Sequence, residues 1–501
     1  MASFEDYYCS TLDSIFPPVI QSWVLCFPCD TSKKHIISNI LQTGFAQTIH
    51  QKPYLAGRLS REDTGPRAGR LKLTYYYPNE NKPVVDTQLF WVNDLTERQD
   101  VWHLSYEELR RQEMPVVQLK PEILEPPLGY EKLASLLIAA QVNFIPGGCL
   151  LSICLNHAFF DGAGGAMVVG AWAQNCKELQ QQHTELTAVS EAEQWEKMPL
   201  VHWNQCENAT AFLSLRLPDI LQDSTAPEDG EAKRILQDRS LWQLLGLQKP
   251  PTDPPTASRG LPPSSSKIMV SAIFTASERS IARLKAASSP YDGDEGAAPY
   301  VSSFDATAAL LWRCIMRARL SDIRESDKTR CSRLRIPVNL RQTLEISHDY
   351  PGNVLLNSVT EMPIESLVAE ANGRRVAPKI RSSLLFSRDA GRALDAIKLS
   401  FVLPEFGSRR PLFSDTTRQD LVLTSWQDLP YYKHDWGPMF GSPGTAEFFR
   451  IPHGYLRGIC ALQPRRIDNN AVEVLVNLEK GQMDKLINDG EFTRYFELKA
   501  L

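Results

Sequence analysis

Apolar residues recur along the chain at the spacings typical of helices and of strands. After Asp30, which can cap a helix, apolar side chains repeat every three or four positions, and this predicts a helix that ends near His50. Residues 136–145 and 149–155 are continuous apolar runs separated by Pro146-Gly147-Gly148. Two such runs around a proline and two glycines predict a β-hairpin.

The second half of the chain repeats this mixture of patterns. Residues 268–274 are strand-like, and residues 277–287 have helical spacing. Residues 302–305 offer an N-cap before the apolar helical stretch 306–316, and valines alternate with other residues over 472–476 as in a strand. Both halves therefore combine helices and strands, which places the protein in the mixed α/β class.

Two segments lack these patterns. Residues 223–266 collect three Pro-Pro pairs and a run of serines, which predicts a crossover linker with one short helix near residues 240–247. Residues 288–299 contain Asp-Gly-Asp-Glu-Gly, a composition that predicts a surface insertion.

The chain is too long for one hydrophobic core. Its 501 residues exceed the roughly 250 to 300 at which a single core stops growing. We therefore expect two domains, at residues 1–222 and 267–501, joined by the linker 223–266.

Composition and charge exclude several classes of protein. With 43% hydrophobic and 23% charged residues, the chain is an ordinary globular protein. Its 54 basic and 59 acidic residues form no long run of either sign, so we expect neither a nucleic acid nor a membrane surface as a partner.

The chain terminus and the cysteines predict a cytoplasmic protein. Residues 1–22 contain Glu5 and Asp6 and no continuous apolar stretch, so they resemble neither a signal peptide nor a membrane anchor. The ten cysteines are scattered, which favours reduced thiols over a disulfide framework. Cys26 and Cys29 form a lone CxxC without a second pair, and we predict no metal site.

The strongest chemical signal follows the second strand of the hairpin, where His157 is succeeded by Asp161 and a glycine-rich stretch. A histidine at a strand end can project into a cleft, and an ordinary histidine pKa of about 6.5 suits proton abstraction near neutral pH. We expect Gly162, Gly164 and Gly165 to form a tight turn, with a helix from Gly165 to Lys177.

Other interpretations of these residues exist. A histidine beside an apolar run is often a core residue, and His157 with Asp161 has the i, i+4 spacing of a metal-binding pair on a helix. The expected turn and the lack of an adjacent third ligand argue against a metal. We expect Asp161 to be structural and to support His157 by holding the turn.

The motif at His157 and four further segments resemble the BAHD-type acyl-CoA-dependent acyltransferases, and in particular their fungal trichothecene-acetyltransferase-like branch. The motif His157-x-x-x-Asp161-Gly162 matches the hallmark of that family. The other similar segments, in the family's order, are Pro53–Leu59, Ser303–Arg319, Val338–Arg341 with Tyr350–Asn353, and Thr424–Trp426 with Asp435–Gly437. One departure occurs in the last segment, where Trp436 replaces a phenylalanine.

The resemblance implies a fold and a reaction. The fold is two chloramphenicol-acetyltransferase-like domains, each a mixed β-sheet flanked by helices, with a channel between them. The reaction is acyl transfer from coenzyme A, with acyl-CoA as co-substrate and no permanently bound cofactor. His157 would be the general base, and Thr424 and Trp426 would stabilise the oxyanion through the hydroxyl and the indole N–H. Trp426 could instead be a core residue.

The resemblance also implies structural roles for Asp435 and Gly437. In the family, this aspartate pairs with an arginine. Both Asp161 and Asp435 need a cation if they are buried, and Arg341 is our first candidate, followed by Arg335. Whether either arginine meets the first or the second aspartate is left open.

Ser302 and Ser303 have two possible uses. At a helix N-terminus they could bind a phosphate of coenzyme A, or they could simply cap the helix.

The predicted function is acyl-CoA-dependent O-acylation, by acetyl transfer, of a hydroxyl on a small secondary metabolite. We expect direct transfer by a monomer. The alternatives are a peptide-synthetase-like condensation enzyme and a non-catalytic small-molecule-binding protein of the same fold. The motifs do not identify the acceptor, because fold does not fix substrate.

Overall fold

The structure of the protein is a computed structural model. It describes residues 4–16, 19–65, 68–76, 88–185, 215–250, 268–290, 300–323, 330–403, 411–412, 416, 418–452, 454 and 458–501. The proline-rich part of the predicted linker (251–266) and most of the predicted surface insertion (291–299) lie outside these residues.

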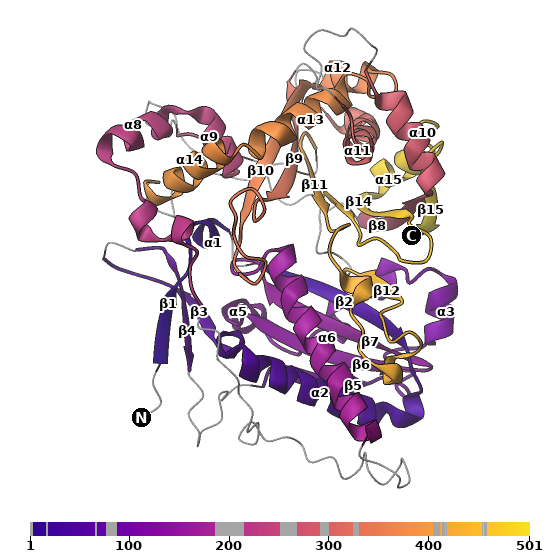
Figure 1. The fold of residues 1–501 in the computed structure, drawn as a ribbon. Helices are drawn as coiled ribbons and strands as arrows, with labels where there is room; N and C mark the ends of the chain where they lie inside the picture. The colour runs from indigo at the N-terminus through magenta and orange to yellow at the C-terminus, as the bar shows by residue number, and fades with distance from the viewer. Residues whose placement is uncertain are drawn as a thin grey trace. The chain divides into compact units, whose positions relative to one another are not determined.

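The chain forms two compact units (Figure 1). The first contains residues 1–218 together with residues 347–353 and 429–455. The second contains residues 219–346, 354–428 and 456–501. The units interleave in sequence, so two segments of the C-terminal half, with Asn353 and Asp435, belong to the first unit. The boundaries at 222 and 266 stay predictions.

The first unit is built on a five-stranded sheet with the order β12-β2-β7-β6-β5. Its strands are β12 (Phe448–Arg450), β2 (Ile20–Pro28), β7 (Gly148–Asn156), β6 (Ile138–Ile145) and β5 (Phe90–Asp94). Only β5 and β6 are parallel neighbours. A three-stranded sheet joins β1 (Phe4–Tyr8), β4 (Leu71–Tyr76) and β3 (Arg58–Arg61) in the order β1-β4-β3. The predicted hairpin is confirmed as β6 and β7.

Two long helices accompany the larger sheet, α2 (Lys34–Gln51) and α6 (Gly162–Glu185). They pack against each other, and the Trp172 indole N–H of α6 donates to the Leu41 carbonyl of α2 at 2.9 Å. Figure 1 shows α6 lying across the strands. The shorter α-helices in the described part of this unit are α1 (Thr11–Ile15), α3 (Tyr106–Arg111), α4 (Pro121–Leu124) and α5 (Tyr130–Ser135).

The second unit has a seven-stranded mixed sheet with the order β10-β9-β11-β13-β14-β8-β15. The strands are β10 (Leu355–Pro363), β9 (Cys331–Asn339), β11 (Leu421–Ser425), β13 (Ile459–Leu462), β14 (Val472–Glu479), β8 (Met269–Ala276) and β15 (Glu497–Ala500). Strand β11 is parallel to both of its neighbours, and the other pairs are antiparallel.

Eight labelled α-helices lie in the described part of the second unit. They are α8 (Asp229–Gln237), α9 (Arg239–Leu244), α10 (Glu278–Ser288), α11 (Ser303–Arg319), α12 (Ile364–Ala369), α13 (Val376–Ser387), α14 (Ala390–Phe401) and α15 (Lys480–Ile487). Helix α8 corrects the prediction of a linker with a single short helix. Its one buried apolar residue, Ile235, was too weak a signal beside the neighbouring prolines.

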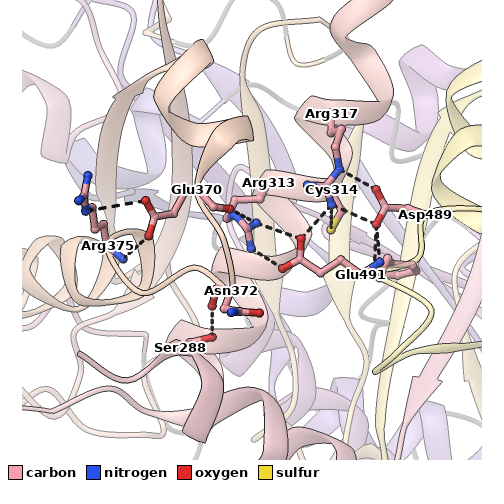
Figure 2. A network of polar contacts seen from close by, with 10 residues as sticks. Ser288, Arg313, Cys314, Arg317, Glu370, Asn372, Arg375, Asp489 and Glu491 are labelled. Carbon is pink, nitrogen blue, oxygen red and sulfur yellow. Dashed lines mark hydrogen bonds and ion pairs between the residues drawn. The ribbon is translucent and has the colours of Figure 1, made fainter. Parts of the chain in front are cut away.

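Helix α11 is buried along most of its length and is tied to the C-terminal region by ion pairs (Figure 2). The Arg313 guanidinium contacts both Glu491 carboxylate oxygens, at 2.6 and 2.9 Å. One turn later, Arg317 contacts Asp489 at 2.7 Å and Glu491 at 3.0 Å. Because the Arg313 side chain is only 2% exposed, its charge depends on Glu491 for compensation.

Candidate active site

His157 stands in a short turn where β7 ends. The Asn156 side chain holds this turn: its amide donates to the carbonyls of Ala134 and Leu136 at 2.7 and 3.2 Å, and its oxygen accepts from the Ala158 N–H. The N–H of Phe160 donates to the Asn156 carbonyl at 2.9 Å. A rigid strand therefore carries His157 into a turn whose backbone groups are hydrogen-bonded.

The orientation of the His157 ring follows from two contacts. Its Nδ1 lies 3.0 Å from the Phe160 carbonyl oxygen, and Phe16 stacks on it with ring centroids 5.3 Å apart. A carbonyl can only accept, so Nδ1 must carry the proton in this bond. In the neutral imidazole, Nε2 then holds the lone pair, which is the arrangement that a general base needs.

Asp161 caps helix α6. It is fully buried, and its Oδ1 accepts the Gly164 N–H at 2.8 Å, the bond expected between an N-cap and the third helical residue. Its negative charge also suits the positive end of the helix dipole. Burial, and then the charge of Asp161, raise the pKa of Tyr431. A structural role for Asp161 remains our prediction, as does its pairing with Arg341.

The glycines after Asp161 lie in a helix, and the predicted tight turn is wrong. Helix α6 starts at Gly162, three residues before its predicted start, and none of the three glycines has a positive φ. At Gly164 and Gly165, close packing leaves no room for a side chain. A Cβ on Gly164 would lie 2.8 Å from the Pro351 carbonyl carbon, and a Cβ on Gly165 would lie 2.6 Å from Trp23.

The structure corrects the predicted partner of Asp435. Its carboxylate pairs with Lys177 of α6 at 2.9 Å, and both side chains are about one third exposed. The sequence analysis named arginine candidates for the case that Asp435 is buried, but Asp435 is exposed enough to pair with a flexible lysine. The ion pair contributes little stability at this exposure.

The segment around Gly437 is held by α6. The Gln180 amide donates to the Trp436 carbonyl at 2.6 Å and accepts the Met439 N–H at 3.0 Å. Gly437 has φ +93, which favours glycine, and a side chain there would meet Gln180. Trp436, which departs from the family pattern, is fully buried and packs on Phe27 and Trp172.

Thr424 and Trp426 lie in the second unit, at the end of β11. The Trp426 N–H donates to the Leu462 carbonyl at 2.9 Å, so the backbone stays paired one residue beyond the strand. Both side chains are partly exposed, so Trp426 is not fully buried, and the choice between a catalytic and a packing role for it stays open. Their convergence on a reaction centre stays a prediction.

Three further predicted site residues lie in the second unit. Arg341 is 1% exposed, and its Nη1 lies 3.3 Å from Asn339 Oδ1. Ser302 caps α11 in a capping box with Asp305, whose carboxylate also accepts from Arg381 at 2.7 Å. The capping use of Ser302 is therefore observed. Binding of a coenzyme A phosphate by Ser302 and Ser303 stays a prediction.

Sequence reasoning missed Asp13, which is linked to the His157 backbone through Asn353. It is fully buried and accepts two hydrogen bonds from Asn353, 340 positions away. The local signal was present, because Ser10 and Asp13 have the spacing of a capping box. That spacing predicts a helix start but no distant partner.

For cysteine pairing, metal binding and membrane spans, the structure provides information only on its described residues. The nine cysteines of the described segments are free thiols, and none of those segments brings together three His, Cys, Asp or Glu residues as metal ligands. Within the described residues, no helix has both the length and the hydropathy needed to cross a bilayer.

Comparisons with known proteins agree with the fold and the motifs. The profile of the Transferase family matches residues 124–493, and that of the trichothecene 3-O-acetyltransferase-like N-terminal domain matches residues 21–176. The chain is 27% identical to eremophilane O-acetyltransferase ORF8 of Penicillium roqueforti and 28% identical to eremophilane O-acetyltransferase prx11 of Penicillium rubens. Each match covers 97% of both chains.

Solved structures support the same fold. F. graminearum TRI101 with coenzyme A and deoxynivalenol is similar with a TM-score of 0.74 at 19% identity, covering 99% of this chain and 100% of that one. Vinorine synthase is similar with a TM-score of 0.55 at 16% identity, covering 96% and 91%. The predicted fold class is thus confirmed. Since the family profile spans most of the sequence, the chain belongs to the Transferase family, and its resemblance to the trichothecene-acetyltransferase-like branch is confirmed.

Proposed function

We propose that the protein is an acyl-CoA-dependent O-acyltransferase that moves an acetyl group onto a hydroxyl of a small secondary metabolite, with His157 as the general base. Membership of the Transferase family and the O-acetyltransferase names of the relatives support acyl transfer. The two Penicillium relatives are named for eremophilanes, which favours a terpenoid-like hydroxyl as acceptor.

One observation carries the assignment of the base, the 3.0 Å contact between His157 Nδ1 and the Phe160 carbonyl. With the proton on Nδ1, Nε2 removes the proton of the acceptor hydroxyl as its oxygen attacks the thioester carbonyl. The tetrahedral intermediate then collapses, the C–S bond breaks, and the imidazolium returns the proton to the coenzyme A thiolate. The atoms and charges balance without a metal or a covalent enzyme intermediate.

Direct transfer is favoured because the cysteine nearest to His157 in the sequence is a poor nucleophile. Cys154 is 1% exposed, and burial, followed by the charge of Glu125, raises the pKa of its thiol. Cys154 and His157 are three positions apart. Because successive side chains of a strand alternate between the two faces of the sheet, we expect these two on opposite faces. The thiolate, which is the reactive form, is therefore disfavoured.

We propose Thr424 and Trp426 as the donors to the developing oxyanion. Both side chains are partly exposed. Thr424 lies in β11 and Trp426 directly follows it, two positions further on, so strand alternation leads us to expect them on one face. We also propose a monomer, which size-exclusion chromatography with light scattering would check.

A substrate screen tests the reaction. The purified full-length protein is incubated with acetyl-, propionyl- or malonyl-CoA and a panel of sesquiterpenoid, alkaloid and polyketide alcohols. We expect an acceptor mass gain of one acyl group with release of an equal amount of free coenzyme A. A protein that binds these alcohols but releases no coenzyme A above the background rate would overturn the proposed function.

Variants test the base. His157→Ala should lower turnover by ~10²- to 10⁴-fold, the usual contribution of a general base. The exposed His103, in the same unit, provides the control His103→Ala, which should keep wild-type turnover. Folded His157→Ala protein with normal turnover would remove His157 from the mechanism. An acylated protein formed from acyl-CoA alone would instead disprove direct transfer.

A further inference from the structure

The backbone around His157 is held by a side chain from a distant segment. Asn353 lies at the end of the segment 347–353, and its Nδ2 lies 3.2 Å from the His157 carbonyl and 3.0 Å from the Ala158 carbonyl. These two carbonyls belong to the turn that positions the imidazole. Asn353 therefore restrains the backbone of the residue proposed as the base.

Asn353 is in turn held by Asp13. Asp13 Oδ1 accepts the Asn353 backbone N–H at 2.8 Å and the side-chain Nδ2–H at 3.1 Å. The three oxygens around Nδ2 come from Asp13, His157 and Ala158, and all of them can only accept, so the amide orientation is determined. The Asn353 Oδ1 lacks a hydrogen-bond partner in the described structure. This orientation of the Asn353 amide therefore leaves its buried Oδ1 without a hydrogen bond, which costs free energy.

The second carboxylate oxygen of Asp13 is also occupied. Oδ2 accepts the Ser10 backbone N–H at 2.9 Å and the Ser10 hydroxyl at 2.6 Å, which forms the capping box of α1. Helix α1 is followed by Phe16, whose ring stacks on the His157 imidazole. The segment of α1 and its C-cap therefore contacts His157 directly through Phe16 and is linked to it indirectly through Asp13 and Asn353.

The surroundings of Asp13 make its charge conditional on pH. The titratable groups around the Asp13 carboxyl are Tyr7, Cys9 and Tyr350, and burial raises the pKa of each. The positive charge of Arg70 partly opposes this rise at the Cys9 thiol. Burial raises the pKa of Asp13 to about 6, although its hydrogen bonds lower it. Asp13 is therefore ionised at pH 7 and becomes neutral as the pH falls through about 6.

We propose that ionised Asp13 is a positioning residue that, through Asn353, holds the His157–Ala158 backbone in the orientation needed for proton transfer. This proposal rests on the proposed function of His157. Protonation of Asp13 removes the negative charge that strengthens its hydrogen bonds to Asn353, so the restraint on the turn weakens. The active form of the enzyme then requires two deprotonated groups, His157 and Asp13.

The test is a set of pH profiles of kcat. In the wild type, log kcat should fall on the acid side with a slope of about 2, because two protons must be absent. Asp13→Asn should lower kcat about 10- to 100-fold at pH 7.5, the effect of a small misplacement of a catalytic group, and reduce the slope to about 1. The KM for acyl-CoA should stay unchanged.

Two further variants keep the test decisive. Asn353→Ala leaves the α1 capping box intact and should reproduce both the loss of kcat and the reduced slope, even if Asp13→Asn does not fold. Glu108→Gln makes the same carboxylate-to-amide change in the capping box that Ser105 and Glu108 form at α3, and it should change neither kcat nor the slope. Circular dichroism and melting curves identify folded variants.

The outcomes separate the two proposals. Wild-type kcat and slope in folded Asp13→Asn and Asn353→Ala proteins, combined with a large loss in His157→Ala, would overturn the positioning role alone. Full activity in folded His157→Ala would instead overturn the proposed base. A loss of kcat in both variants with an unchanged slope of about 2 would make their role purely structural and would refute the pH-dependent positioning.

Discussion

Replacing Gly164 by alanine should disturb the protein at the junction between α6 and the segment 347–353. The added Cβ would lie 2.8 Å from the Pro351 carbonyl carbon and closer still to its oxygen. Ordinary contact begins at 3.4 Å, so one backbone must retreat by roughly 0.6 Å or more. Both segments are constrained, because the Gly164 N–H is capped by Asp161 and the neighbouring Asn353 is bonded to Asp13.

Two opposing terms set the size of the effect. Alanine is better than glycine within a helix by up to about 1 kcal/mol. Overpacking costs about 1 to 3 kcal/mol, and the upper end applies here because the clash is with a backbone carbonyl instead of a flexible side chain. The clash should therefore win, with a net loss of about 2 kcal/mol in the free energy of unfolding.

Gly481→Ala is the matched control. Gly481 is exposed near the start of α15, and a Cβ there meets nothing within 4 Å. Only the helix-propensity term applies, so this variant should be unchanged or stabilised by up to about 1 kcal/mol. The two substitutions are chemically identical, but only Gly164→Ala should lower the free energy of unfolding.

Urea unfolding followed by tryptophan fluorescence measures the stabilities, and steady-state kinetics measures kcat on the same samples. Because the retreat of Pro351 displaces the segment that ends at Asn353, Gly164→Ala should also lower kcat, whereas Gly481→Ala should not. If Gly164→Ala were as stable as Gly481→Ala and retained wild-type kcat, the reasoning would be refuted, because the close approach at Pro351 would cost no measurable free energy.

Three other predictions concern charges and the oxyanion site. Asp161→Asn should lower the melting temperature, because it removes the negative charge at the N-terminus of α6, and a normal melting temperature with abolished activity would favour direct participation of Asp161 in catalysis. Trp426→Phe should lower kcat by ~10²- to 10³-fold with little loss of stability, and an unchanged kcat would leave Thr424 or another donor at the oxyanion. Glu491→Gln should destabilise the protein by about 3 to 5 kcal/mol by leaving Arg313 uncompensated, and a loss below 1 kcal/mol in urea unfolding would show that solvent or Asp489 compensates for it.

Local features of the fold were predictable because neighbouring residues encode them. Periodicity located α2, the β6–β7 hairpin and α10, and capping residues located the start of α11 at Ser302. The HxxxDG motif made His157 and Asp161 candidate site residues for the same reason, since strand, turn and helix follow one another within a dozen positions. Proline-rich composition was a poorer guide, and it concealed α8.

Contacts between distant segments required the tertiary structure. Nothing in the order of residues indicates that Gly164 faces Pro351, that Asp435 meets Lys177, or that Asp13 supports His157 through Asn353. Such pairings depend on how the chain returns to the same place after tens or hundreds of residues. The sequence by itself determined which residue types could perform the chemistry, and the folded chain decided which partners orient them, because orientation arises from packing and hydrogen bonds that no local spacing contains.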